Sequence, residues 1–180
     1  GGIRGPRSLP DADRESILAD IGRTALGTPA PLEGQLRAAL EGVRVIDLCI
    51  VLAGPTCGRT LAEFGADVVR IDNPQRGNVV FHVDINRGKR SLLLDLKKPE
   101  GLDVFWKLLE NTDVVVQNFR KGVAERLGIG YEAVKARKPD IIYASLNTYG
   151  RVGPWADRPG HEQIAQAATG MQERYGGDGR

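Results

Sequence analysis

Histidine and cysteine are scarce in this sequence, with two of each among 180 residues. The cysteines, Cys49 and Cys57, share one short segment but lack the CxxC spacing of zinc sites, and the histidines, His82 and His161, lie elsewhere. We therefore expect no metal site. Two cysteines without such a pattern are typical of reduced thiols, which predicts a cytoplasmic protein.

An excess of one charge and long apolar runs are also lacking. The formal net charge is +2, so the chain has no overall basic field of the kind found in nucleic-acid-binding proteins. No apolar stretch approaches the length of a membrane span. Hydrophobic residues make up 41% of the chain, which is enough for the core of a globular domain. We expect neither a nucleic-acid nor a membrane partner, and any electrostatic function requires local clusters of charge.

From residue 40 onward, short apolar runs alternate with helical patterns. Runs rich in β-branched residues and leucine predict strands at 43–48, 66–72, 91–96, 113–118 and 141–147. Apolar residues at helical spacing predict helices at 13–22, 56–64, 99–109, 131–138 and 161–168. The stretch between the second and third strands reads as a long polar loop. This alternation predicts an α/β fold, an open, mostly parallel, Rossmann-like sheet with helices on both faces.

Composition divides the chain into three parts. Residues 1–22 end in the first predicted helix, residues 23–39 are rich in small residues, proline and glycine, as linkers are, and residues 40–180 form the organised domain. The sequence begins with Gly-Gly rather than Met and ends in GGDGR, so we expect it to be a piece of a longer protein.

Cationic residues gather near strand ends, which is where parallel sheets bind ligands. The segment after the fourth strand contains Arg120 and Arg126, whose planar guanidinium groups suit phosphate. The stretch NRGKRSLLLDLKKPEG adds, among its cations, Arg87, Lys89, Arg90 and Lys97. Taken alone, the cluster after the fourth strand is as typical of a solvated turn as of a binding site, and the NRGKRSLLLDLKKPEG cluster is more typical of solvated loops. Together they favour a ligand with several phosphates, such as a nucleotide-bearing cofactor.

Two further patterns leave alternatives open. Gly54 and Asp72 imitate the spacing of a dinucleotide-binding fold, but GxGxxG is absent and Pro55 removes an amide donor, which disfavours NAD. His161 and Glu162 are adjacent at a predicted helix start. They form either an acid–base pair or an ordinary helix start with a carboxylate favoured by the helix dipole.

The motifs, read in order, resemble the amino-terminal half of the family III CoA-transferases, the CaiB/BaiF group. The resemblance covers residues 40–180. The stretches that carry it are LEGVRVIDL, VLAGPTCGRTLAEFGADVVRID, NRGKRSLLLDLKKPEG, DVVVQNFRKGVAERLGIGYE and GPWADRPGHEQIAQAATG. The resemblance explains the cations, because the 3′-phosphate and diphosphate of coenzyme A (CoA) need positively charged loops.

The resemblance also implies site residues. The CoA-binding positions that match are Leu52, Ala53, Asn73, Leu94, Asp95, Leu96, Lys97, Asn118, Phe119, Arg120, Arg126, Arg158 and His161. Asn73 departs from the family, which often has arginine or proline there. His161 and Glu162 are expected beside the thioester. The nucleophilic aspartate is expected beyond Arg180, and Asp178, in a glycine-rich turn, is no substitute for it.

As the family works, an aspartate attacks an acyl-CoA thioester and a carboxylic acid finally accepts the CoA. The resemblance implies an interlinked homodimer for the full-length protein and no CoA transfer by the isolated chain. The helix DRESILADIG is similar to the last helix of the family, which predicts that residues 1–22 are the tail of a preceding unit. Two alternatives stay open, an α-methylacyl-CoA racemase that uses His161 as the base, and a non-catalytic CoA-binding module.

Overall fold

The computed structural model describes residues 9–21, 38–76 and 82–176, so most of the predicted linker lies outside the described residues. The strands are β1 (Arg44–Asp47), β2 (Asp67–Asp72), β3 (Arg90–Leu93), β4 (Val114–Gln117) and β5 (Ile142–Ser145). The helices are α1 (Arg14–Ile21), α2 (Ala53–Glu63), α3 (His82–Ile85), α4 (Pro99–Glu110), α5 (Val123–Arg126), α6 (Tyr131–Arg137), α7 (Glu162–Ala168) and α8 (Met171–Gly176).

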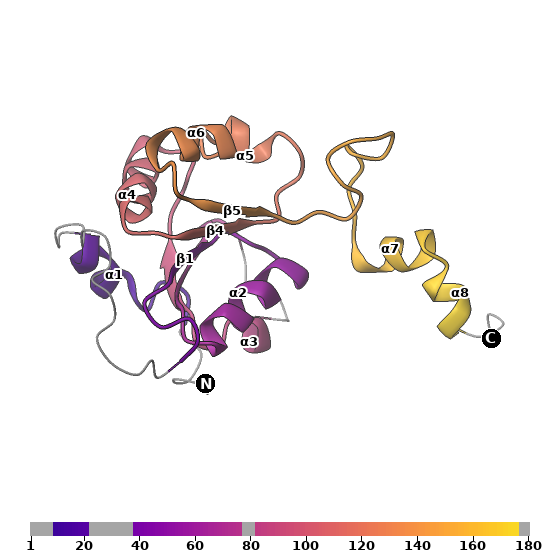
Figure 1. Cartoon of the computed structure of the whole chain (residues 1–180), viewed down its shortest axis with the longest axis horizontal. Coiled ribbons are helices and arrows are strands. Elements are labelled where there is room, and N and C mark those ends of the chain that lie inside the picture. The colour runs from indigo at the N-terminus through magenta and orange to yellow at the C-terminus, as the bar shows by residue number, and fades with distance from the viewer. Residues whose placement is uncertain (1–8, 22–37, 77–81, 177–180) are drawn as a thin grey trace.

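The five strands form one parallel sheet in the order β3-β2-β1-β4-β5. Helices α4, α5 and α6 cover one face and α2 and α3 the other (Figure 1). This confirms the predicted open, Rossmann-like α/β fold. Because β1 is central and the chain leaves it first for β2 and later for β4, the switch point of the sheet lies between β1 and β4.

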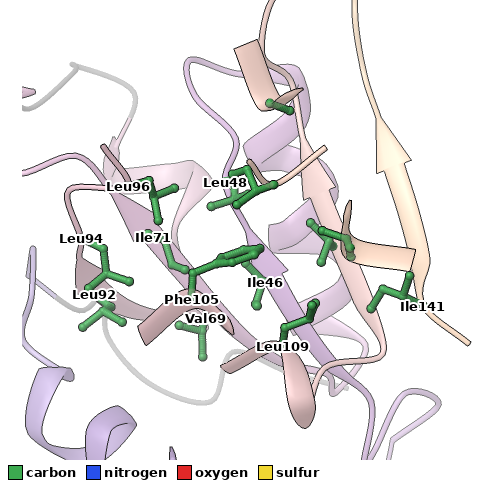
Figure 2. Packing of buried hydrophobic residues seen from close by; sticks show 14 of the residues in the cluster. Ile46, Leu48, Val69, Ile71, Leu92, Leu94, Leu96, Phe105, Leu109 and Ile141 are labelled. Carbon is green, nitrogen blue, oxygen red and sulfur yellow. The ribbon is translucent and has the colours of Figure 1, made fainter. Parts of the chain in front are cut away.

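The larger part of the core lies between the sheet and α4. Successive strand residues point to opposite faces, so Ile46 and Leu48 face this helix while Val45 and Cys49 join the smaller cluster under α2. Figure 2 shows the ring of Phe105, from α4, between Ile46 and Ile71. Its side chain is fully buried. The predicted apolar face of this helix is therefore confirmed.

The outer edge of β3 is covered by the segment that contains α1. The amide of Ser91 donates to Asp13 Oδ2 at 2.9 Å, and the amide of Leu93 donates to Asp11 Oδ1 at 2.8 Å. Arg14 Nη2 donates to the carbonyl of Leu93 at 2.9 Å. Ile17 is fully buried in the main core. The described part of residues 1–22 thus packs on this sheet, and its origin in a preceding unit stays a prediction.

Three short helices were not predicted. Helix α3 lies in the expected loop, and α5 and α8 span four and six residues, too few to show a periodic pattern. Helix α2 begins three residues before the predicted helix. Ala53, Gly54 and Pro55 form its first turn, where proline is tolerated because the amide it lacks has no intrahelical partner.

Helices α7 and α8 contact each other and extend away from the sheet (Figure 1). Neither helix has a buried residue, and Ile164, Met171 and Tyr175 are exposed. No helix in the described ranges is both long enough and apolar enough to cross a bilayer.

We expect Phe105→Ala to destabilise the chain by about 3–5 kcal/mol, because it removes a fully buried ring from the centre of the core. Chemical denaturation followed by circular dichroism measures the change. Lys107→Ala, on the exposed face of the same helix, is the control and should stay within about 0.5 kcal/mol of wild type. A small loss for Phe105→Ala would contradict the packing shown in Figure 2.

Candidate functional site

The candidate site is the edge of the sheet at which all five strands end. Because the strands are parallel, the loops that follow them meet at this edge. The described parts of these loops are residues 48–52, 73–76, 94–98, 118–122 and 146–161. They contain every residue that the resemblance predicts for CoA binding except Ala53, which opens α2, and Arg126, which ends α5.

Asn118 joins the loops that follow β1 and β4. Its Oδ1 accepts the amide of Ile50 at 2.8 Å, and its Nδ2 donates to the carbonyl of Ile50 at 2.7 Å. Both ends of the side-chain amide are therefore engaged by the backbone. Gly54 makes room for this contact, since a Cβ there would lie 3.2 Å from Asn118 Cγ and 2.6 Å from Cys49 Sγ.

The β1–α2 loop, residues 48–52, is strained at one point. Val51 has φ 71°, a region that β-branched residues rarely occupy. Leu52 follows as the N-cap of α2, and its side chain and that of Ala53 are exposed. The first amides of a helix have no intrahelical acceptor, so those of Ala53 and Gly54 are available to an anion at this helix start.

Beneath the same loop lies a buried ion pair. Lys89 Nζ donates to Asp47 Oδ2 at 2.6 Å and to the carbonyl of Pro55 at 2.7 Å, and both charged side chains are 1% exposed. Asp47 Oδ1 accepts the amide of Cys49 at 2.9 Å. Burial lowers the pKa of Lys89, and the neighbouring Asp47 carboxylate opposes that shift. The pair thus links the end of β1, the residue before β3 and the first turn of α2.

The cations of NRGKRSLLLDLKKPEG do not lie together. Arg87 and Lys89 precede β3 and Arg90 is its first residue, whereas Lys97 follows that strand. Of the first three, only Lys89 extends its ammonium group under the β1–α2 loop, where Asp47 and the carbonyl of Pro55 bind it. Arg90 forms a bidentate pair with Asp67 at 2.8–3.0 Å, and Arg87 lies 3.2 Å from Asp84. The expectation that all four cations face one phosphate ligand is wrong, because three of them are neutralised in structural ion pairs.

Lys97, Arg120 and Arg126 have exposed side chains at the carboxyl edge. In the part of the chain that the structure describes, none of them has an acidic partner within 4.0 Å. Gly122, at φ 77°, leaves space for Arg126, whose Nη1 would lie 2.9 Å from a Cβ at that position. These three cations are available to an anionic ligand.

The loop after β5 is tied to the loops beside it. Arg151 donates to Ser145 Oγ, which also accepts Gln117 Nε2 at 2.7 Å, and Gln117 Oε1 accepts the amide of Phe119 at 2.7 Å. Lys121 lies 3.3 Å from Asp157. This chain of contacts connects residues 145–157 with the Asn118–Arg120 segment.

The other residues predicted for the site, Arg158, His161, Glu162 and Asn73, differ in the contacts that their side chains make. The guanidinium of Arg158 lies 5.2 Å from the ring centroid of Trp155. His161 is the exposed N-cap of α7, and its side chain makes no capping hydrogen bond, while Glu162 Oε1 accepts Gln166 Nε2 at 2.9 Å. Asn73 Oδ1 accepts the amide of Gln75 at 2.8 Å.

In the loop after β3, the side chains of Leu94 and Leu96 are buried, and Asp95 Oδ1 accepts the amide of Lys97 at 3.1 Å. The residues expected to bind CoA after β3 therefore offer a ligand mainly their backbone and the lysine.

Sequence reasoning missed the Asp47–Lys89 pair and the chain from Arg151 to Phe119. The one available signal was Asp47 itself, a carboxylate inside the apolar run VRVIDL, because a buried charge requires a partner. The sequence did not indicate which cation that partner is.

Both cysteines are free thiols. Burial, followed by the nearby Asp47 carboxylate, raises the pKa of Cys49 and of Cys57, so neither thiol is activated as a nucleophile. Within the described ranges, no group of three or more His, Cys, Asp or Glu side chains is placed to hold a metal ion.

With this geometry established, comparison with known proteins identifies the family. The model of CoA-transferase family III matches residues 40–180. The chain therefore belongs to CoA-transferase family III, and the predicted family is confirmed.

Individual relatives agree with this assignment. An acyl-CoA transferase of Fusarium pseudograminearum is 36% identical over 189 residues, covering 92% of this chain and 41% of the relative. Human alpha-methylacyl-CoA racemase is 40% identical over 141 residues, covering 78% of this chain and 36% of the enzyme. The crystal structure of a CaiB/BaiF family protein from Brucella suis superposes with a TM-score of 0.69 at 35% identity, covering 75% of this chain and 40% of that one. The chain thus spans about two fifths of the length of these relatives.

We expect Gly58→Ala to destabilise the chain by about 1–3 kcal/mol, although alanine is the better helix former. A Cβ at this position in α2 would lie 2.3 Å from Asp47 Oδ2 and 3.1 Å from Lys89 Nζ, so the buried pair must move. Denaturant unfolding measures the change. Thr60→Ala, exposed on the same helix, is the control, with a change within about 0.5 kcal/mol. Equal stability of Gly58→Ala and wild type would show that the pair tolerates displacement.

Proposed function

We propose that this chain supplies the CoA-binding half of a CoA-transferase that moves CoA from an acyl-CoA thioester to a carboxylic acid. One observation carries the proposal. Lys97, Arg120 and Arg126 are exposed and unpaired within the described structure, at the same edge of the sheet as the start of α2. Three cations and a helix start are suited to the diphosphate and 3′-phosphate of CoA.

The bound nucleotide then directs the thioester toward His161 and Glu162. A carboxylate from the part of the protein beyond this chain attacks the acyl carbonyl and expels CoA as its thiolate, which leaves a mixed anhydride. The thiolate attacks the enzyme's own carbonyl in that anhydride, so the acyl group leaves as a carboxylate and CoA is held as an enzyme thioester. The acceptor acid takes CoA through the same two steps in reverse.

In this scheme the described residues bind and orient CoA, and amides at the strand ends stabilise developing negative charge. The homodimer and a preceding unit for residues 1–22 belong to the same proposal. Membership of CoA-transferase family III supports the homodimer, whereas the preceding unit rests on the likeness of DRESILADIG to the last helix of the family.

We expect Arg126→Ala to weaken CoA binding by about 1–3 kcal/mol, because it removes a charge-assisted contact to a phosphate. Isothermal titration of the full-length protein with CoA measures the affinity. Arg137→Ala is the control. It removes the same charge from α6, next to the amino-terminal edge of the sheet, where the guanidinium stacks on Trp106 at 4.0 Å. Unchanged affinity for Arg126→Ala would remove this arginine from the site.

Racemisation is the second candidate, because the human racemase is among the relatives and His161 has an exposed imidazole in the matching segment. In that reaction a histidine removes the α-proton of a 2-methylacyl-CoA and a proton returns to the opposite face. The acyl-CoA transferase relative and the transferase-like stretch QIAQAATG support transfer instead.

Incubation of the full-length protein with 2-methylacyl-CoA in deuterated water separates the two reactions. We expect no rapid α-deuteration in the absence of an acceptor acid, because transfer does not break the α-carbon–hydrogen bond. Mass spectrometry of the recovered thioester measures deuterium uptake, and His161→Ala identifies any exchange that depends on this imidazole. Fast exchange without an acceptor, abolished in His161→Ala, would replace transfer by racemisation. A protein that binds CoA but shows neither reaction would be a non-catalytic CoA-binding module.

A further inference from the structure

We propose that Asn118 and Lys89 are positioning residues that hold the β1–α2 loop in its strained conformation, rather than side chains that contact CoA. This inference rests on the proposed function, since it concerns how that site is shaped. It changes the expected role of Asn118, and it adds the ion pair between Asp47 and Lys89, two residues whose pairing the sequence did not indicate.

Asn118 holds the loop at its start. The side-chain amide of Asn118 makes two hydrogen bonds to the backbone of one residue, Ile50, at 2.7 and 2.8 Å. Paired residues of neighbouring strands exchange two hydrogen bonds in the same way. A side-chain amide has two donors and one oxygen, and here the oxygen and one donor are committed to the backbone. The second N–H and the second lone pair of the oxygen stay open, so a direct contact with CoA through them is the alternative that the test below distinguishes.

Lys89 holds the loop at its other end. Its ammonium group donates to the carbonyl of Pro55, in the first turn of α2, while Asp47 binds both this ammonium and the amide of Cys49. Both charges are almost completely buried, so no ligand reaches them. The pair therefore acts on the site only through the backbone between Cys49 and Pro55.

Val51 lies between the two attachment points and explains why they are needed. Its φ of 71° is costly for a β-branched side chain, and such a conformation persists only when its surroundings enforce it. If either attachment is lost, the loop relaxes toward φ below zero. That change alters the direction in which Leu52 and the amides of Ala53 and Gly54 face the ligand.

The test compares three variants of the full-length protein. We expect Asn118→Ala to accelerate amide hydrogen exchange in residues 50–56 and to weaken CoA binding roughly tenfold, the scale of one strained residue. Adding Val51→Gly should restore most of the affinity, because glycine adopts φ 71° without strain. Asn111→Ala, at the C-cap of α4, is the control and should leave both measurements unchanged.

A second arm tests Lys89 without leaving a buried charge unpaired. The double variant D47N/K89M is neutral and close to the original in volume, so it should fold. The side-chain oxygen at position 47 can still accept the amide of Cys49 in this variant. The hydrogen bond from position 89 to the carbonyl of Pro55 is lost. We expect faster exchange at the start of α2 and weaker CoA binding, again restored by Val51→Gly.

The outcomes are distinct. Weaker CoA binding by Asn118→Ala with unchanged exchange, or without recovery by Val51→Gly, would show that Asn118 contacts the ligand directly and would overturn the inference. Unchanged exchange in D47N/K89M would remove Lys89 from it. If the wild-type protein binds no CoA, the proposed function fails, while the exchange measurements still decide whether these residues hold the loop.

Discussion

The buried ion pair between Lys89 and Asp47 is the constraint on which the rest of this structure depends. Two charges enclosed in a protein interior are tolerated only when each has its partners in place, and here one carboxylate and one ammonium share the backbone groups of Cys49 and Pro55 between them. Such a pair positions the elements that it joins, and it adds little to the free energy of unfolding. It requires a glycine at position 58, fixes α2 against the central strand, and places the start of that helix at the edge where the loops converge.

The same motif that suggested a phosphate ligand contributes to both edges of the sheet, because β3 runs through the middle of it. Arg87 and Lys89, before the strand, pair with Asp84 and Asp47, and its first residue, Arg90, pairs with Asp67, so all three are part of the framework. Lys97 and Lys98, after the strand, remain exposed. Charge density along a sequence is therefore a poor guide to a binding site in a parallel sheet, whereas the position of each charge relative to its strand separates the ion-paired cations of this motif from the exposed ones.

Much of the fold was predictable from local patterns. All five strands and the helices that begin at Arg14, Pro99, Tyr131 and Glu162 were located to within about three residues, because buried strands and amphipathic helices impose periods on the sequence. One-turn helices impose none, so α3, α5 and α8 were missed. In the site, the resemblance selected the loops, but it could not show that both ends of the Asn118 amide are used by Ile50, or that Lys89 pairs with a residue 42 positions away. Such partners are set by tertiary packing, which leaves no local signal.

The two edge strands of the sheet, β3 and β5, differ in whether their outward backbone groups are already hydrogen-bonded. Along β3 the outward amides and carbonyls are saturated by the carboxylates and guanidinium of residues 11–14. Along β5 the described chain places no strand beyond the one that pairs with β4, and Ile142 is 62% exposed. An unpaired border is a template for strand addition, and a saturated one is not. Within the described residues, the edge along β5 is therefore the one open to pairing with a sixth strand, from the same polypeptide or another.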